Sequence, residues 1–192
     1  MSRYFPEAMG NHMTRPDHVD RLRAQWRAQE PELDTSPVEI FGRIYRISRL
    51  ISPGIEAALG RHGLDRGEFD VLATLRRQGA PFRLTPTDLY AALLVASGSL
   101  THRLGRLEKA GLIRRVPSER DGRSLSAELT EAGHAAVMAA YRDDMAFEAG
   151  PPEGLEPEAR DDLAGALRHL MGGGETALKS PAGSSVGGST AG

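Results

Sequence analysis

Residues 84–115, LTPTDLYAALLVASGSLTHRLGRLEKAGLIRR, decide the fold of this chain. Thr85-Pro86 is a typical helix start, because threonine caps a helix well and proline fits its first turn. We therefore expect a short helix that ends at Leu93. Ser97-Gly98-Ser99 predicts the start of another helix, which ends near Ala110-Gly111. The connection between the two helices is so short that a tight helix-turn-helix is the natural result.

The helix predicted to start at Ser97-Gly98-Ser99 carries two different faces. Leu100, Leu104 and Leu107 recur at helical spacing and are expected to face the core. A polar and basic stripe lies about 110° away around the helix, at roughly 100° per residue. Arginine can bind guanine edges or phosphates, and serines near a helix N-terminus can bond phosphate oxygens. The residues of this region that we expect to contact DNA are Ser97, Ser99, Thr101, His102, Arg103 and Arg106.

The sequence after Gly111 changes from helical to strand periodicity. Residues 112–116, LIRRV, and 124–129, SLSAEL, predict two strands around a polar Asp-Gly turn. Between residues 97 and 125 there are seven Lys or Arg and three Asp or Glu, so this segment is +4 in a chain of formal net charge −2. A solvated amphipathic helix would also show a basic face. The adjoining helix and the basic two-stranded turn instead favour a winged helix-turn-helix that meets a polyanion.

The remaining sequence predicts further helices between two tails, so the fold class is mainly α with a small β wing. Ile40, Ile44, Ile47 and Ile51 mark a long helix that should kink or split at Pro53-Gly54. The expected segments are a disordered tail over 1–16, an extra helix over 17–30, a main domain over 36–171 and a flexible Gly/Ser-rich tail over 172–192. The other helices expected in the main domain cover about 67–78, 131–147 and 155–171.

Three stretches together resemble the winged helix-turn-helix of the MarR family of bacterial transcription regulators. They are GEFDVLATLRRQG at 67–79, the segment 84–115, and SERDGRSLSAELTEAG at 118–133. The resemblance places the DNA-binding lobe at about 67–134 and extends more weakly over 36–171. It implies an intertwined homodimer with N- and C-terminal dimerisation helices, in which each subunit lays its recognition helix in a major groove of a pseudo-palindromic operator. It also implies that Arg123, with Arg120 as its neighbour, reaches a minor groove.

The extra N-terminal helix with its tryptophan and the stretch FDVLATLRR resemble the urate-responsive, PecS-type branch of that family. This resemblance implies a repressor that a small anionic effector releases from DNA, and it implies effector-binding roles for Trp26, Asp70, Arg103 and Arg115. A tryptophan face can stack on a flat anion such as urate, and an arginine can neutralise it. Each residue also has a purely structural interpretation, such as an apolar anchor for Trp26 and a salt bridge for Asp70. Small carboxylates are the alternative effectors.

The composition excludes several classes of function. The chain has no cysteine, which excludes disulfides, thiolate metal sites and the peroxide-sensing branch of the family. The six histidines lack metal-site spacing, and no nucleophile elbow or phosphate-binding loop occurs, so we expect no metal, no cofactor and no enzyme activity. No apolar run of about 18 residues occurs, and the N-terminus lacks an apolar signal core. We therefore expect a cytoplasmic protein without a membrane segment.

Two other functions stay open on the sequence alone. A non-specific architectural DNA-binding protein would show a steep salt dependence but little operator preference. An enzyme would need a catalytic set assembled from scattered residues such as Asp70, His102 and Arg115. The combination of a basic helix and a basic wing favours a sequence-specific regulator over both.

Overall fold

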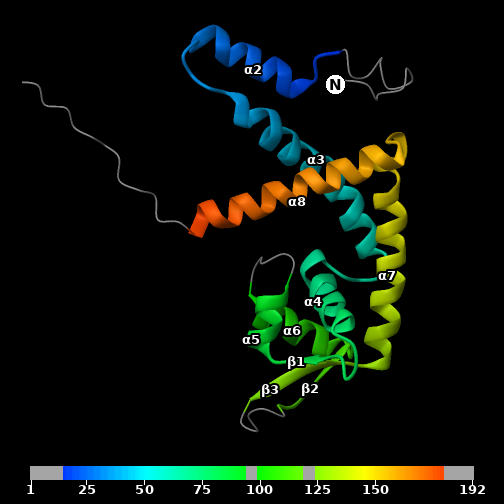
Figure 1. Ribbon diagram of the computed structural model, residues 1–192. Coiled ribbons are helices and arrows are strands. Elements are labelled where there is room, and N and C mark those ends of the chain that lie inside the picture. Colours follow the sequence, from blue (N-terminus) through cyan, green and yellow to red (C-terminus); the bar gives the residue numbers. More distant parts are fainter. Residues whose placement is uncertain (1–14, 94–98, 119–123, 180–192) are drawn as a thin grey trace, which may run out of the picture. The chain divides into compact units, whose positions relative to one another are not determined.

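The computed structural model describes residues 15–93, 99–118 and 124–179 (Figure 1). The chain divides into two compact units between Gly150 and Pro151. The first unit combines helices with a small antiparallel sheet, and the second consists mainly of one long helix. The predicted fold class, mainly α with a small β wing, is confirmed.

Helix α2 (His18–Gln29) packs on α3 (Ser36–Gly60). Asp17 caps α2 and, together with Asp20, forms a capping box at its start. Both carboxylates also bind the guanidinium of Arg43 on α3, with Nε 2.9 Å from Asp17 Oδ2 and Nη2 2.7 Å from Asp20 Oδ1. Ion pairs therefore attach the extra N-terminal helix to the next one.

Helix α3 runs unbroken through Pro53, so the predicted split at Pro53-Gly54 does not occur. Helix α7 (Glu131–Ala149) packs along α3. The ring of Phe147 fills the space over Gly54, where a Cβ would overlap it. We attribute the continuity of α3 to this packing, which offsets the hydrogen bond that proline cannot donate.

Three helices follow in the predicted order: α4 (Arg66–Arg77), α5 (Pro86–Ala92) and α6 (Leu100–Lys109). Asp65, Thr85 and Ser99 are their N-caps, and each accepts a hydrogen bond from a backbone N–H of the first turn. The helix starts predicted at Thr85-Pro86 and at Ser99 are therefore confirmed.

The sheet has the strand order β1-β3-β2 and is antiparallel, and its strands are β1 (Arg83–Leu84), β2 (Ile113–Pro117) and β3 (Leu125–Leu129). Strands β2 and β3 match the two predicted strands, and Ile113 lies opposite Leu129. Periodicity cannot predict β1, since two residues are too few to alternate.

The core of the first unit lies among α3, α4, α6, α7 and the sheet. As predicted, Leu104 and Leu107 are buried, and Leu100 packs partly buried against them. Gly133, near the start of α7, is needed for this packing, because a Cβ there would overlap the carbonyl group of Leu112. These contacts fix α6 in one orientation about its axis.

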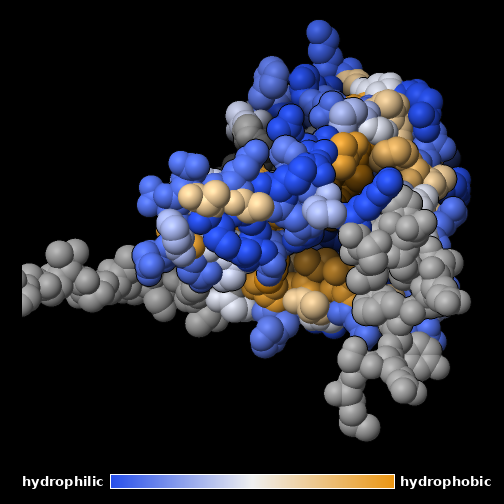
Figure 2. Space-filling model, turned by 90° about the horizontal axis from the view of Figure 1, so that it is seen from above, coloured by the Kyte–Doolittle hydropathy of each residue, from blue (hydrophilic) through white to orange (hydrophobic). Residues whose placement is uncertain are grey.

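The part of α3 before Pro53 leaves a row of large apolar side chains exposed. Their exposed fractions lie between 43% and 67%, and the residues are Ile40, Phe41, Tyr45, Ile47 and Leu50. Figure 2 shows apolar patches among the hydrophilic surface of the face seen from above. The predicted apolar stripe of this helix is therefore present, and the described part of the first unit leaves it exposed. Apolar surface on this scale is typical of a protein–protein contact.

The second unit contains a short 3₁₀ turn (Pro151–Gly154) and α8 (Pro157–Lys179). The helix continues past Gly172, where the flexible tail was expected to begin. Helix formers on both sides of the glycines account for this, because propagating an existing helix costs less than starting one. None of the described helices is both long and apolar enough to span a bilayer.

Candidate nucleic-acid interface and adjoining pocket

The N-terminal turn of α6 presents a polar, exposed surface. Ser99 caps the helix, and its hydroxyl oxygen accepts a hydrogen bond from the backbone N–H of His102 at 3.4 Å. Ser99, Thr101 and His102 are all exposed. Side chains of this kind at a free helix end can bond phosphates or base edges. The predicted contact Ser97 lies outside the described residues.

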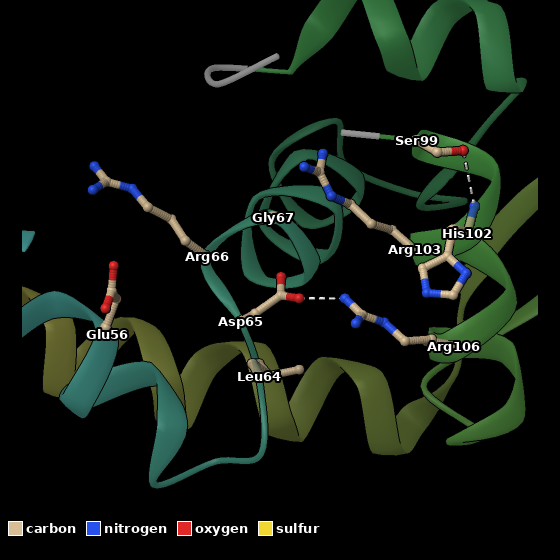
Figure 3. Close-up of a pocket in the computed structure, with 9 residues that line it drawn as sticks. All are labelled: Glu56, Leu64, Asp65, Arg66, Gly67, Ser99, His102, Arg103 and Arg106. Carbon is tan, nitrogen blue, oxygen red and sulfur yellow. Dashed lines mark hydrogen bonds and ion pairs between the residues drawn. The ribbon is translucent and has the colours of Figure 1, made fainter. Parts of the chain in front are cut away.

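Arg103 lies between α6 and α4 rather than on the free flank of α6. Only 8% of this residue is exposed. Its guanidinium lies against Gly67 in the first turn of α4 (Figure 3), where a Cβ would overlap it. The absence of a side chain at Gly67 thus makes room for Arg103. Helical periodicity gives the angle between two faces of a helix but not which element packs against each face. It therefore could not predict that Arg103 lies against the first turn of α4.

Arg106 is half exposed and binds two carboxylates of α4. Its guanidinium bonds Asp65, and its Nε lies 2.8 Å from Glu68 Oε1. The same two residues form the capping box of α4: Asp65 Oδ1 accepts from the backbone N–H of Glu68 at 2.7 Å, and Glu68 Oε2 accepts from that of Asp65 at 2.9 Å. Burial raises the pKa of Asp65, but hydrogen bonds from Glu68 N–H and Arg106 outweigh burial and hold this pKa below its ordinary value.

The base of the wing is tied across all three strands by Glu128. Its side chain is 7% exposed, with Oε2 2.6 Å from Arg83 Nε on β1 and Oε1 2.9 Å from Arg114 Nε on β2. Burial raises the pKa of Glu128, but the two guanidiniums outweigh burial and lower it. Arg120 and Arg123, the predicted minor-groove contacts, lie outside the described residues.

A pocket of about 690 Å³ opens between the start of α4 and α6 (Figure 3). Arg66, Arg103 and Arg106 supply its positive charge, opposed by Glu56 and Asp65. Three arginines against two carboxylates leave the lining with an excess of one positive charge, and Arg106 is paired with Glu68 as well as with Asp65. The full lining is Glu56, Leu64, Asp65, Arg66, Gly67, Ser99, His102, Arg103 and Arg106. Within the described part of the chain, no group of three or more His, Asp or Glu side chains could hold a metal ion.

Of the four predicted effector residues, Arg103 is the one that lines this pocket. Trp26 lies on α2 and is 49% exposed, and Asp70 is buried on α4. Arg115 lies on β2, with its Nε 3.6 Å from Glu108 Oε2 on α6. The described structure thus does not gather the four side chains in the pocket between α4 and α6.

The sequence analysis did not single out Asp65 and Glu68 at the start of α4. The helix begins at Arg66, one residue before the expected start near Gly67, and Asp65 is its cap. The pattern Asp65-x-x-Glu68 before an apolar run is a capping-box signature that could have found this start. The pairing of Asp65 with Arg106 has no local signal, because the two residues are 41 positions apart.

The family model described as the MarR family matches residues 62–124. The chain is 41% identical over 125 residues to the HTH-type transcriptional regulator PecS of Dickeya dadantii, an alignment that covers 65% of this chain and 75% of that protein. It is 31% identical over 94 residues to the transcriptional activatory protein BadR of Rhodopseudomonas palustris, covering 49% of this chain and 54% of that protein.

Solved structures with the same fold include the MarR family regulator Sco5413 of Streptomyces coelicolor, with a TM-score of 0.62 and 22% identity over 74% of this chain and 98% of that one. A MarR family regulator of Silicibacter pomeroyi has a TM-score of 0.60 and 24% identity over 80% and 97%. BpsR of Bordetella bronchiseptica, whose DNA binding is regulated by 6-hydroxynicotinic acid, has a TM-score of 0.55 and 21% identity over 67% and 92%.

Proposed function

Since this chain belongs to the MarR family of DNA-binding transcriptional regulators, we propose that it is a repressor that a small anionic effector releases from its operator. The effector class is a flat, urate-like purine or a small carboxylate. Its site is the pocket between α4 and α6. The protein acts by binding, without chemistry on the effector.

The observation that carries this proposal is the composition of the pocket wall. Arg103 and Arg106 belong to α6, and Arg66 belongs to α4, so an anion between them would touch both helices at once. A bound anion forms charge-assisted hydrogen bonds with guanidiniums, which draws them from their present partners. The packing of α6, the helix proposed to contact DNA, against α4 would thereby change. The anion would then bind the DNA-bound and DNA-free conformations with different affinities, which is what an effector needs in order to shift the equilibrium between them.

The DNA-facing surface that we propose is the exposed start of α6. Ser99 and Thr101 bond phosphates, and His102 reaches a base edge in the major groove. Ser97 extends this surface, and Arg120 with Arg123 at the wing tip reaches the minor groove. These three positions rest on the sequence prediction.

The dimer that we propose forms through the exposed apolar face of α3. The described part of the first unit leaves this face exposed, and a second copy would cover it. Two-fold symmetry would place two copies of α6 about one DNA turn apart, which suits a pseudo-palindromic operator. Trp26, Asp70 and Arg115 do not line this pocket, and their effector roles stay predictions from the sequence resemblance that the pocket proposal does not use.

The test is an operator-release titration. A duplex selected by the wild-type protein from a randomised library serves as the operator probe, and binding is followed by fluorescence anisotropy. Urate, xanthine, citrate and 6-hydroxynicotinate are the test anions, with uncharged nicotinamide as the matched control. We expect at least one anion, and not nicotinamide, to release the probe, and Arg66→Gln to weaken that response.

No release by any of these anions at millimolar concentration contradicts the effector proposal. Equal affinity for a scrambled duplex would instead indicate the non-specific architectural protein. Transcription from a reporter that carries the selected duplex then separates repression from activation.

A further inference from the structure

Asp65 and Glu68 perform two tasks at one place. They cap α4, and they bind Arg106 of α6. We infer that these two carboxylates are positioning residues for DNA recognition, which act by holding α6 in its DNA-competent orientation through Arg106. This inference rests on the proposed role of α6 as the helix that enters DNA.

The geometry makes this contact stiff. Each carboxylate is itself fixed by a backbone hydrogen bond of the capping box, so neither can follow Arg106 if α6 turns. The Glu68 side chain is only 12% exposed, which shields its pair with Arg106 from solvent more than an ordinary surface ion pair. Two anchored acceptors on one guanidinium therefore define both its distance and its direction.

A second contact lies one turn earlier on α6. The guanidinium of Arg103 rests on Gly67, which lies between Asp65 and Glu68 in the same turn of α4. These two polar contacts add to the buried leucines of α6 in restraining its rotation about its own axis. The rotation of α6 sets the direction of the exposed side chains of Thr101 and His102. A change in this rotation would displace all the proposed base contacts together.

The position of Arg106 separates this role from direct base reading. An arginine that reads guanine needs its paired nitrogens free for the base edge. In this structure Nη2 of Arg106 binds Asp65 (Figure 3), and its Nε lies 2.8 Å from Glu68 Oε1. Arg106 therefore supports DNA binding by holding α6 against α4, and the carboxylates of Asp65 and Glu68 are the groups to which it binds.

The same device occurs at α2 and provides a matched control. There the capping box of Asp17 and Asp20 binds Arg43 of α3. The chemistry is the same, but α6 takes no part in it. Asp17→Asn/Asp20→Asn thus removes two paired carboxylates without changing the contacts between α6 and α4.

The experiment uses Asp65→Asn/Glu68→Gln in the full chain. Asparagine and glutamine each keep one oxygen for the capping hydrogen bond and place an NH2 group where the other oxygen accepted from Arg106, so the cap stays and the pairing with Arg106 is lost. Affinity is measured for the selected operator duplex and for a scrambled duplex, with the melting temperature alongside. We expect operator affinity to fall roughly tenfold, an effect of the size of one good charge-assisted contact, while scrambled-duplex affinity holds or rises. In an Arg106→Ala background the same two changes should add nothing.

Unchanged or tighter operator binding by the double variant overturns the inference, because it would mean that the carboxylates compete with DNA for Arg106. An equal loss in Asp17→Asn/Asp20→Asn overturns it too, since the effect would then be general. His102→Ala tests separately whether α6 is the recognition helix. If His102→Ala alone weakens operator binding, α6 contacts DNA but the two carboxylates do not position it. If no variant weakens operator binding, α6 is not the helix that contacts DNA. If the double variant does not fold, Asp65→Asn alone is judged by the same outcomes.

Discussion

The carboxylate of Glu128 on β3 binds the guanidinium of Arg114 on the neighbouring strand β2, with Nε 2.9 Å from Oε1. Its other oxygen binds Arg83 on β1. Arg83 and Arg114 both lie opposite Glu128 in the strand register. One buried side chain thus joins three strands at a single level, and the wing extends from a fixed base.

Replacing Glu128 by alanine should lower the free energy of unfolding by roughly 1–3 kcal/mol, because two guanidiniums lose a buried acceptor. Chemical denaturation followed by circular dichroism measures this change. Glu131→Gln, an exposed change at the start of α7, is the control and should have an effect below about 0.5 kcal/mol. Equal values for the two variants would refute the role of the buried carboxylate.

The contribution of Glu128 should also depend on pH. Its pKa is lowered in the folded state, so its stabilisation is complete above the unfolded value of 4.5 and is lost as pH falls through the lower folded pKa. The stability difference between wild type and Glu128→Ala should therefore stay constant from pH 7 to about pH 5 and shrink in more acidic solution. A difference that persists at pH 2 would show that packing, not charge, is responsible.

Two adjacent aspartates on α7 should respond to neutralisation with opposite signs. Asp144 is buried, its Oδ1 has no hydrogen-bond partner among the described residues, and burial raises its pKa against the pull of Arg66. Its ionised form therefore costs stability at neutral pH, and that cost disappears as pH falls through the raised pKa. Asp144→Asn should raise the melting temperature at pH 7 and not in acid.

Asp143 is the counterpart. A hydrogen bond with His62, followed by one from Arg61, lowers its pKa. Asp143→Asn should therefore lower the melting temperature at pH 7, and the loss should vanish in acid. The same sign for both variants at pH 7 would contradict these assignments.

Gly67→Ala should displace Arg103 from the first turn of α4. The added methyl group overlaps the guanidinium, and overpacking of this kind costs roughly 1–3 kcal/mol. Denaturant midpoints report the cost, and operator affinity should fall with it. Gly60→Ala is the control, because nothing lies within 4 Å of a Cβ there. That change should be neutral or stabilising by up to about 1 kcal/mol.

Ile47→Glu should break the proposed dimer. Ile47 is 57% exposed in the single chain, so the charge costs nothing in a monomer but is buried without a partner in a dimer. Sedimentation velocity should show monomers, and operator affinity should collapse with them. Gln78→Glu, at the end of α4, should leave the oligomeric state unchanged. A dimer that survives Ile47→Glu would exclude this face of α3 as the interface.

Elements whose ends carry local signals could be predicted from the sequence. Thr85 and Ser99 cap helices where expected, and β3 forms where the alternating pattern predicted a strand, although Ser126 and Glu128 are buried and Leu125 is exposed. The continuity of α3 through Pro53 could not be predicted, since it depends on Phe147 at the far end of α7. Local periodicity describes one element at a time, whereas this outcome depends on a neighbour distant in sequence.

The candidate site shows the same limit. The stripes on α6 were predictable, and the buried one holds Leu104 and Leu107 as expected. Arg103 and Arg106 were both predicted as DNA contacts, and the resemblance also implied an effector site shared by Arg103 and Asp70 of α4. The pairing of Arg106 with Asp65 and Glu68 was not predicted. Charged side chains at a ligand site are its least predictable part, because their partners are set by tertiary contacts.

The partial exposure of Asp65 and Arg106, 49% and 45% of their side chains, has a consequence for solution studies. Mobile ions weaken this attraction as ionic strength rises. Added electrolyte would then act on the complex twice, once at the DNA backbone and once inside the protein. A footprint counted from the slope of affinity against salt would therefore exceed the number of phosphates that the protein touches.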